Sequence, residues 1–295
     1  MKIFLTGASG FIGKNFISYF DNKFSVDTYK RGSNFEINHE VVVHLAGKAH
    51  DLKNTSMDSE YYEVNTNLTK KIYKEFLGSK AKVFILLSSV KAVADSVDGI
   101  LTEDLTPSPE THYGKSKLLA EQYILSQHLS DSKRFFILRP CMVHGPHNRG
   151  NLNLLYKLIS KNIPWILGSY ENKRSYCSIE NLLFIIYEII HNDNIKSGIY
   201  NVADDIPIST NELISIIAKS QNKKAKIFKI SKNIIKCIAK IGDIFKLPLN
   251  TVSLNKLTNS YVVSNHKILN HIGKPLPISS KNGLIKTFDY FNSNE

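Results

Sequence analysis

The sequence predicts an α/β fold: a doubly wound parallel sheet with a smaller C-terminal portion built onto it. Three observations predict this fold. Strand-like apolar runs alternate with helix-like segments from Met1 to Pro140. Residues 41–47 and 82–90 hold nearly unbroken apolar runs, as in parallel strands that are buried on both faces. The first strand-like run leads directly into a glycine turn, TGASGFIG at residues 6–13.

Each element of the first half follows from a local pattern. The expected strands and helices alternate at 2–6 (strand), 10–20 (helix), 23–30 (strand), 41–47 (strand), 59–78 (helix), 82–90 (strand), 112–128 (helix) and 134–140 (strand). Gly78 is expected to cap the helix that ends there. Residues 31–40 show no helical period and are too short for a full crossover helix. Residues 95–111 are rich in turn residues and proline, which predicts a loop.

The regular alternation loosens after Pro140. Further helices are expected at 151–162, 179–192 and 209–221, and a strand at 198–204. We expect residues 1–142 to bind a dinucleotide and residues 143–295 to bind substrate, with part of the second segment returning to the main sheet. The segment 232–246 is amphipathic and basic. It is expected to pack against its own domain, although such a helix can also lie on a membrane surface.

Composition excludes several classes of function. The formal net charge is +12, but the lysines are scattered, so no nucleic-acid-binding stripe is expected and the charge suits a phosphorylated ligand. Cys141, Cys177 and Cys237 are widely spaced and are expected to be buried, reduced thiols, with no metal site. No apolar run approaches the ~18 residues of a membrane span. Because a strand starts almost at Met1, no signal peptide is expected, and we predict a cytoplasmic protein.

The glycine turn predicts a Rossmann-like phosphate site. Gly7, Gly10 and Gly13 stand between a strand and a helix, in the pattern G-x-x-G-x-x-G. Glycines there allow a tight turn and close approach of a pyrophosphate, while the helix N-terminus offers free N–H groups. A glycine pattern alone is a weak signal, and a plain tight turn is the alternative. Its position at the first strand-to-helix junction favours a dinucleotide.

The end of the second strand bears on the choice of cofactor. An acidic residue there would mark NAD, whereas basic residues accommodate the 2′-phosphate of NADP. Asp27 lies within the strand, and Lys30 and Arg31 follow it. NADP(H) is therefore favoured over NAD(H), although Lys30 and Arg31 as plain surface residues remain an alternative.

A tyrosine and a lysine four residues apart suggest catalysis. Tyr113 and Lys117 in HYGKSK fall on one face of the expected helix. An ammonium beside a phenol is expected to lower the phenol pKa, which helps the tyrosine to exchange a proton. Ser88 and Ser89 at the end of a buried strand offer a third hydroxyl to orient the reacting oxygen. Such a pair is common by chance, but the glycine turn and the strand-end serines in this order make the signal strong.

The motifs resemble those of the extended short-chain dehydrogenases/reductases, in the group of nucleotide-sugar epimerases, dehydratases and reductases. The resemblance covers nearly the whole chain, through TGASGFIG, VVVHLAG, VNTNLT, LLSSVKAV, HYGKSKLLAEQ, LRPCMVHGP, RGNLN and NKRSYCSIENL. It implies Ser89, Tyr113 and Lys117 as the catalytic triad, and it selects Ser89 over Ser88. It also implies a homodimer formed by the helices near 67–77 and 113–128.

The resemblance and the glycine turn together give the candidate binding residues. Candidate cofactor contacts are Gly7, Gly10, Phe11, Ile12, Gly13, Lys30, Arg31, Glu36, Ala46, Gly47, Asn65, Lys117 and Pro140. Candidate substrate contacts are Ser89, Lys91, Tyr113, Asn151 and Arg174, the last two toward the diphosphate or uridine of a nucleotide sugar.

The chain also departs from the family pattern at three places. The helix between strands two and three is reduced to residues 31–40, where Glu36 is the only substitute for an acidic residue near the adenine. Residues 92–94 read AVA where the family has VYG, and residues 272–274 read IGK in place of LGW.

The resemblance leaves three functions to weigh. Dehydration is rejected, because Val90 and Lys91 follow Ser89 where a dehydratase has an acid pair. The sequence favours an NADPH-dependent reductase acting at C4 of a UDP-linked 4-keto-6-deoxy-2-acetamido sugar, in surface-polysaccharide synthesis. A UDP-sugar 4-epimerase with tightly held NAD is the alternative. A non-catalytic sensor or scaffold is remote, since Ser, Tyr and Lys are all present.

Overall fold

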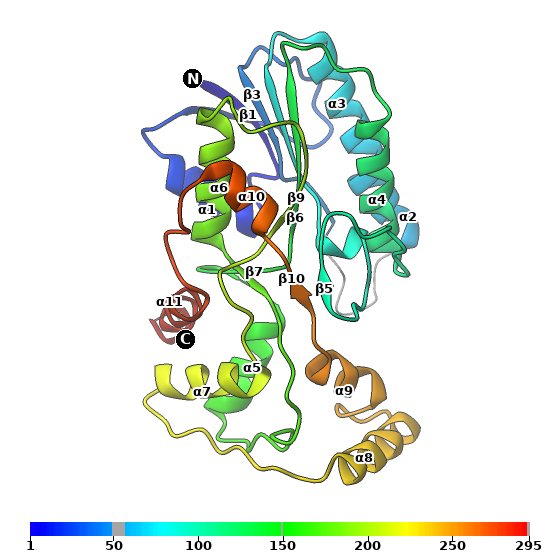
Figure 1. Ribbon diagram of the computed structural model, residues 1–295, viewed down its shortest axis with the longest axis vertical. Coiled ribbons are helices and arrows are strands. Elements are labelled where there is room, and N and C mark those ends of the chain that lie inside the picture. Colours follow the sequence, from blue (N-terminus) through cyan, green and yellow to red (C-terminus); the bar gives the residue numbers. More distant parts are fainter. Residues whose placement is uncertain (49–56, 149, 294–295) are drawn as a thin grey trace.

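Six parallel strands form the central sheet of the computed structural model, which describes residues 1–48, 57–148 and 150–293 (Figure 1). In the order β2-β1-β3-β4-β6-β9, they are Ser25–Thr28, Lys2–Thr6, Val41–His44, Val83–Leu87, Arg134–Pro140 and Gly198–Val202. The chain builds outward from β1 in both directions, so the strand order reverses between β1 and β3. Folds of this kind bind ligands at the carboxyl ends of the strands beside such a reversal.

Helices cover both faces of the sheet, which confirms the predicted doubly wound α/β fold. One face carries α1 (Phe11–Phe20), α6 (Ile179–His191) and α10 (His266–Ile272), and the other carries α3 (Leu68–Gly78) and α4 (His112–Leu125) (Figure 1). Val41 and Val43 join the core beneath α1 and α6, whereas Val42 between them joins the core beneath α3 and α4. This alternation explains why three successive valines occupy the strand.

No helix or strand forms between β2 and β3 in residues 29–40, all of which the structure describes. Phe35 and Ile37 partly take the place of a crossover helix. The Phe35 ring lies 5.5 Å from the Phe4 ring, and Ile37 is buried against the same core. β2 is the edge strand of the sheet. Because no helix forms between β2 and β3, the loop that follows β2 is exposed.

The helix predicted at 59–78 is divided into three parts. It consists of α2 (Asp58–Tyr61), a π-helical segment η1 (Tyr62–Asn67) and α3. A π-helix bonds each N–H to the carbonyl five residues back, so its turn is wider than that of an α-helix. The prediction of Gly78 as the cap was wrong by one residue. Ser79 is the C-cap, because its N–H and hydroxyl both donate to the Phe76 carbonyl, at 3.2 and 2.9 Å.

The C-terminal half returns to the sheet and also builds a second core. β9 pairs with β6, and α6 and α10 pack on the sheet. The remaining helices α5, α7, α8, α9 and α11 surround residues such as Leu213 and Phe288 at the other end of the molecule (Figure 1). Their bounds are Asn151–Ser160, Thr210–Ser220, Lys232–Phe245, Thr251–Thr258 and Ser280–Ser293. Two small parallel pairs complete the fold: β5 (Ile100–Leu101) with β10 (Val262–Val263), and β7 (Met142–His144) with β8 (Tyr176–Ser178).

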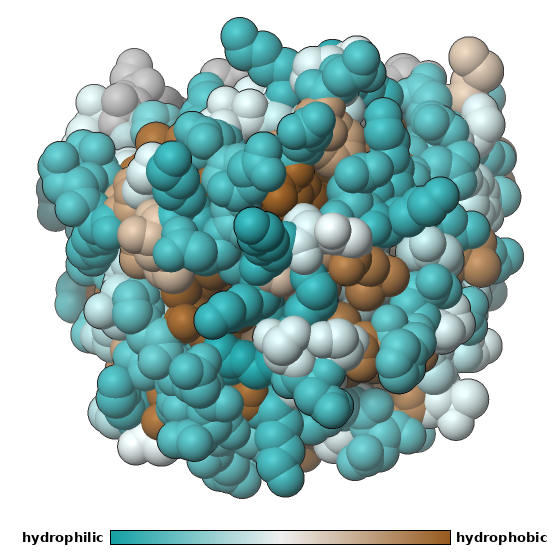
Figure 2. Space-filling model, turned by 90° about the horizontal axis from the view of Figure 1, so that it is seen from above, coloured by the Kyte–Doolittle hydropathy of each residue, from teal (hydrophilic) through white to brown (hydrophobic). Residues whose placement is uncertain are grey.

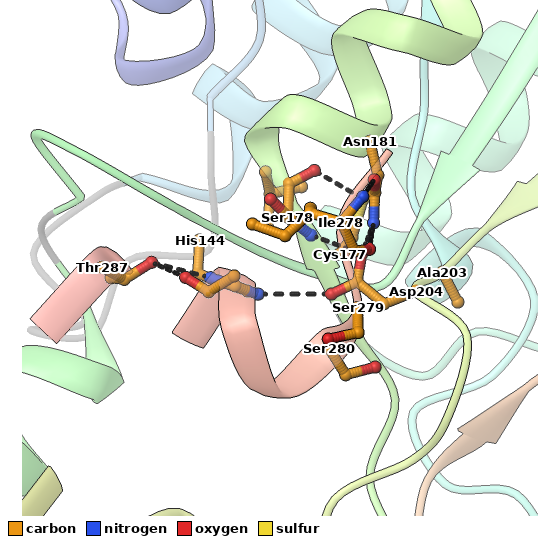
Figure 3. A network of polar contacts seen from close by, with 12 residues as sticks. His144, Cys177, Ser178, Asn181, Ala203, Asp204, Ile278, Ser279, Ser280 and Thr287 are labelled. Atoms are coloured by element: carbon orange, nitrogen blue, oxygen red, sulfur yellow. Dashed lines mark hydrogen bonds and ion pairs between the residues drawn. The ribbon is translucent and has the colours of Figure 1, made fainter. Parts of the chain in front are cut away.

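A buried polar network within the C-terminal half joins elements that pack on the sheet to elements of the second core (Figure 3). His144 of β7 pairs its Nδ1 with the hydroxyl of Thr287 at 2.9 Å and its Nε2 with a carboxylate oxygen of Asp204 at 3.4 Å. The other oxygen of Asp204 accepts from the Ser178 N–H at 2.8 Å and from the Asn181 amide at 2.6 Å. Strands β7 and β8, helix α6, the end of β9 and helix α11 are thereby held in one arrangement.

Two further sequence expectations can be compared with the fold. In the IGK segment, Ile272 is buried, Gly273 is the left-handed cap of α10, and Lys274 pairs with Glu188 at 2.8 Å, so this segment still packs on α6. All three cysteines are free, but Cys237 is exposed, which corrects the expectation that all are buried. The reason is that α8 buries only a narrow row of its residues. Among the described helices, none is long and apolar enough to cross a membrane.

Candidate active site

Four neighbouring strands deliver the predicted residues to one edge of the sheet. Gly7 follows β1, Ala46 and Gly47 follow β3, Ser89 follows β4, and Pro140 ends β6. The carboxyl ends of parallel strands share an edge, so these residues gather there although 133 positions separate Gly7 from Pro140.

The three glycines of the turn differ in how much room the structure leaves for a side chain. Gly7 has φ +76°, and a Cβ there would lie 2.5 Å from the Ala46 nitrogen. A Cβ on Gly13 would lie 2.1 Å from the Gly7 oxygen. Gly10 has φ −74°, and its Cβ would meet only the Gly7 oxygen, at 3.3 Å. The turn itself therefore requires Gly7 and Gly13, whereas a side chain at Gly10 would be only slightly crowded.

The N-terminus of α1 fits the diphosphate of a dinucleotide. Phe11, Ile12 and Gly13 form its first turn, where backbone N–H groups have no acceptor within the helix. This turn lies wholly within the described residues and carries no acidic side chain. The N–H groups and the positive end of the helix dipole suit a bound anion, and Gly10 leaves the approach open.

Replacing Gly10 with alanine is expected to weaken dinucleotide binding by roughly tenfold or more, a loss of about 1.4 kcal/mol. The added methyl group points at the space a diphosphate needs, while the fold has nearly enough room for it. Gly13→Ala is the matched control and should lower the melting temperature, because its methyl group collides with backbone. Isothermal titration and thermal melting separate the two effects. Unchanged affinity in a folded Gly10→Ala protein would show that the segment is only a turn.

The two candidate serines point to different partners. Ser88 donates its hydroxyl hydrogen bond to the buried carboxylate of Glu121. The side chain of Ser89 is hydrogen-bonded to the phenol of Tyr113. Ser89 Oγ also accepts from the Lys91 N–H at 3.2 Å. The geometry thus brings Ser89, and not Ser88, to the tyrosine.

Helix α4 holds Tyr113 and Lys117. Its first turn is capped by Thr111, which accepts from the Gly114 N–H at 3.2 Å. Asp95 accepts from the N–H groups of Glu110 and Thr111 at 2.9 and 3.1 Å. The start of the helix is therefore anchored to the loop after β4, directly beside Ser89.

The expected effect of Lys117 on the phenol is corrected. Burial raises the pKa of Tyr113, with a smaller rise from Tyr61, while the Ser89 hydrogen bond lowers it. The ammonium of Lys117 donates instead to the Leu87 carbonyl at 2.9 Å. Burial lowers the pKa of Lys117 to about 8, against the opposing effect of Glu121. Tyr113 is therefore held in its protonated form, which can donate a proton.

Asn65 and Gly47 lie beside the lysine. Asn65 is buried in the π-helical segment, accepts from the Lys48 N–H at 2.8 Å and donates to the Ser116 hydroxyl at 2.9 Å. A Cβ on Gly47 would lie 2.9 Å from Lys117 Nζ and 3.1 Å from Asn65 Oδ1. The absence of a side chain at Gly47 thus leaves room for the ammonium of Lys117 and the amide of Asn65.

Sequence analysis missed His44, which lies in the apolar run of β3. It is fully buried, with Nδ1 2.6 Å from the Thr6 hydroxyl and Nε2 2.9 Å from the Thr69 hydroxyl. Burial and the charge of Lys117 lower its pKa to about 3, so the imidazole is neutral. It links β1, β3 and α3 beneath the site. A histidine inside a buried strand is the only sequence signal that could have indicated it.

The predicted adenosine contacts remain exposed. Lys30, Arg31 and Glu36 all lie on the open loop after β2. The hydrogen bond from Lys48 lowers the pKa of Glu60 in α2, and the charge of Arg31 adds a small decrease, so this loop lies near that helix. Asp27 is engaged elsewhere, since its carboxylate lies 2.8 Å from His39 Nε2.

Two of the predicted substrate contacts lie in a group of cations. Lys91 Nζ lies 4.5 Å from the centre of the Tyr261 ring and donates to the Asp95 carbonyl at 2.7 Å. Burial lowers the pKa of Lys91, the charge of Asp95 opposes this effect, and the charges of Arg174 and Lys256 add smaller decreases. Arg174 donates to the Lys256 carbonyl of α9. Three positive charges near Ser89 suit an anionic part of a substrate. Asn151 is exposed at the first position of α5.

Comparison with known proteins agrees with this geometry. The model of the "NAD dependent epimerase/dehydratase family" matches residues 3–203. A UDP-glucose 4-epimerase from Vibrio cholerae is 33% identical over 254 residues, 75% of this chain and 76% of that protein. An N-acetyl-alpha-D-glucosaminyl-diphospho-ditrans,octacis-undecaprenol 4-epimerase from Escherichia coli O157:H7 is 29% identical over 76% of this chain and 73% of that protein.

Solved structures share the fold at low sequence identity. The UDP-glucuronic acid 4-epimerase from Bacillus cereus in complex with NAD superimposes with a TM-score of 0.77 at 20% identity, over 99% of both chains. RMD from Pseudomonas aeruginosa, complexed with NADPH, gives a TM-score of 0.74 at 17% identity, over 98% of this chain and 99% of that one.

Proposed function

The chain belongs to the NAD dependent epimerase/dehydratase family, and on that premise we propose that it is a reductase acting at C4 of a UDP-linked 4-keto-6-deoxy-2-acetamido-hexose. Its relatives are enzymes that act on nucleotide sugars and related diphospho-sugars. The observation that carries the proposal is the hydrogen-bonded Ser89–Tyr113 pair, with Tyr113 held protonated by burial. A protonated phenol beside a serine hydroxyl is suited to donating a proton to a ketone oxygen.

Each residue of the site has a separate role in the proposed reaction. The bound dinucleotide would supply a hydride to C4, so the carbonyl carbon gains hydrogen and its oxygen gains negative charge. Ser89 orients that oxygen, and Tyr113 donates its proton to it, leaving the alcohol. Lys117, with its pKa near 8, can return a proton toward the phenolate. Asn65 and Gly47 shape the space beside Lys117 for the ribose.

The cation group supports an anionic, diphosphate-containing substrate. The charges of Arg174 and Lys256 both act on Lys91, which stands two residues after Ser89 in the chain. A nucleoside diphosphate would receive charge-assisted hydrogen bonds there. Dehydration fits the site poorly, because Asp95, the acid nearest Lys91 in the chain, already accepts from the N–H groups of Glu110 and Thr111.

A UDP-sugar 4-epimerase is the second candidate. It is favoured by the two relatives described above, which are both named as 4-epimerases. An epimerase first removes hydrogen from C4 and so needs Tyr113 as a base, whereas burial favours the protonated phenol. An epimerase also retains its NAD, whereas a reductase exchanges its cofactor in each turnover.

NADPH is expected to bind roughly tenfold more tightly than NADH, because one charge-assisted contact to the 2′-phosphate contributes about 1.5–3 kcal/mol before solvent screening. Lys30 and Arg31 are exposed and free to make that contact after β2. The double change Lys30→Ala, Arg31→Ala should erase the preference and leave NADH affinity nearly intact. Fluorescence titration of both cofactors measures it. Equal affinities in the unchanged protein would contradict the assignment.

The proposed function is tested by incubating the protein with NADPH and a panel of UDP-linked 4-keto-6-deoxy sugars. Loss of nicotinamide absorbance together with formation of the 4-hydroxy sugar is expected. Mass analysis of nucleotide released by heat is the companion measurement. Stoichiometric bound NAD, with interconversion of a UDP-hexose and its 4-epimer without added cofactor, would replace the reductase by the epimerase.

A further inference from the structure

Helix α8 presents an apolar stripe to solvent. Ile234, Ile238, Ile241 and Phe245 recur at intervals of four, three and four residues, so they lie on one face of the helix. All four are exposed, Ile241 by 50% and Phe245 by 69% of their surfaces. Ile244, Leu247 and Val252 are exposed nearby, at 75%, 46% and 62%. Seven large apolar side chains in a segment of 19 residues are far from the scattered pattern of an ordinary surface.

The protein buries a different and narrower row of this helix. Ile235, Ala239 and Gly242 are its buried residues, which confirms that α8 packs against its own domain, through one large side chain and two small residues. A Cβ on Gly242 would lie 1.9 Å from the Leu249 carbonyl oxygen, so the backbones are in close contact. Asp243 accepts from the Thr251 N–H at 2.9 Å. These contacts fix the rotation of α8 and hold the apolar stripe outward.

A row of lysines runs along the side of α8 opposite the apolar stripe, because a turn of about 100° per residue places positions 232, 236 and 240 there. Lys232, Lys236 and Lys240 are spaced by four residues and exposed, and Lys246 follows the helix end. Asp243 is the only acidic residue between 232 and 246, and its carboxylate is bound to Thr251. Long lysine side chains can reach lipid head groups while neighbouring apolar residues enter the acyl boundary.

The position of α8 permits contact with a flat surface. Figure 1 places α8 at the end of the molecule farthest from the upper edge of the sheet. The opposite end, seen from above in Figure 2, is mostly hydrophilic, with apolar residues scattered among polar ones. The end of the molecule that carries α8 is basic and apolar, and it thus differs from the end seen in Figure 2.

We propose that α8 docks the protein on an anionic phospholipid membrane, lying in the head-group layer without spanning it. The apolar stripe would be buried in the membrane, and the lysines would be attracted to its negatively charged surface. A helix with lysines on one side and large apolar residues on the other has the pattern of helices that lie on anionic membranes, which favours a lipid surface over a second copy of this chain. The proposal is independent of the reaction at Tyr113.

Vesicle co-sedimentation of the full-length protein tests the proposal. Binding to vesicles of equal parts phosphatidylglycerol and phosphatidylethanolamine is expected, with little binding to phosphatidylcholine and a loss of binding at high salt. The change Ile241→Asp, Phe245→Asp should weaken binding roughly 100-fold. The change Lys236→Glu, Lys240→Glu should weaken it at least about 25-fold, since one lysine contributes about fivefold. Ile206→Asp is the matched control, since Ile206 is 54% exposed outside α8, and it should bind as the unchanged protein does.

Cys237 provides a readout at the helix itself. Of the three cysteines, Cys141 and Cys177 are buried and Cys237 is exposed on α8, so a polarity-sensitive thiol dye should label Cys237 selectively. The emission of the dye should shift to the blue on anionic vesicles and not on neutral ones. Three outcomes would overturn the proposal: absence of vesicle binding, equal binding by the Ile241→Asp, Phe245→Asp protein, or sedimentation velocity showing that this change only converts a dimer to a monomer.

Discussion

Replacing Tyr113 with phenylalanine is expected to lower turnover by roughly 10²–10⁴-fold, the usual range for loss of a general acid. The phenol is the proton donor of the proposed reaction, and burial keeps it protonated. The ring and its packing remain in the variant, so nucleotide-sugar affinity should change little. Steady-state kinetics with NADPH and the keto sugar, together with binding titrations, measure both quantities.

Tyr61→Phe is the matched control for this experiment. The Tyr61 ring lies 6.3 Å from the Tyr113 ring, so the same hydroxyl is removed close to the same site. Turnover of this control should stay within a few fold of the unchanged protein. Normal turnover in Tyr113→Phe, or an equal loss in both variants, would remove Tyr113 from the role of acid.

Breaking the buried ion pair between Glu121 and Arg139 is expected to cost about 3–5 kcal/mol of unfolding free energy. Arg139 Nη2 lies 2.6 Å from Glu121 Oε2, and both side chains are almost fully buried. Ser88 donates to the same carboxylate. Arg139→Met would leave a buried carboxylate without its counter-ion. Chemical denaturation should report the loss, and the melting temperature should fall on the order of 10 °C.

A double-mutant cycle separates the ion pair from simple packing. Glu121→Gln keeps an acceptor for Ser88, and the double variant with Arg139→Met should lose clearly less than the sum of the single losses. Lys286→Met is the surface control. It removes the exposed pair with Glu180, at 2.9 Å, and should cost at most about 1 kcal/mol. Fully additive losses in the cycle would show that Glu121 and Arg139 do not stabilise the protein as a pair.

Local sequence patterns were sufficient for the elements of the sheet and for the motifs at its edge. The apolar runs located β1, β3, β4 and β6, because a strand buried on both faces consists mostly of apolar residues. The glycine turn predicted the start of α1 at its correct place. The four-residue spacing placed Tyr113 and Lys117 on one helix face, since this relation depends on helix geometry alone.

Local sequence patterns could not predict contacts between residues on different elements of the fold. The sequence alone did not separate Ser88 from Ser89, because the choice depends on which side chain faces α4, and only the resemblance selected Ser89. The Glu121–Arg139 pair joins residues 18 positions apart on different elements. The pKa of Tyr113 was expected to fall, because its degree of burial and the carbonyl that binds Lys117 were unknown. Local periodicity describes neighbours along one element, whereas these features depend on tertiary packing.

The π-helical segment that carries Asn65 has a consequence for insertions and deletions. A π-turn accommodates one residue more than the α-turn it replaces. Removing one residue from Tyr62–Asn67 would let Asp58–Gly78 close into a single α-helix, in which the residues before and after the segment keep their faces while those within it, Asn65 among them, change direction. Asn65 could then no longer reach both Lys48 and Ser116. The length of this segment is therefore part of the site, and related chains should be aligned here by helical register before side-chain identity is compared.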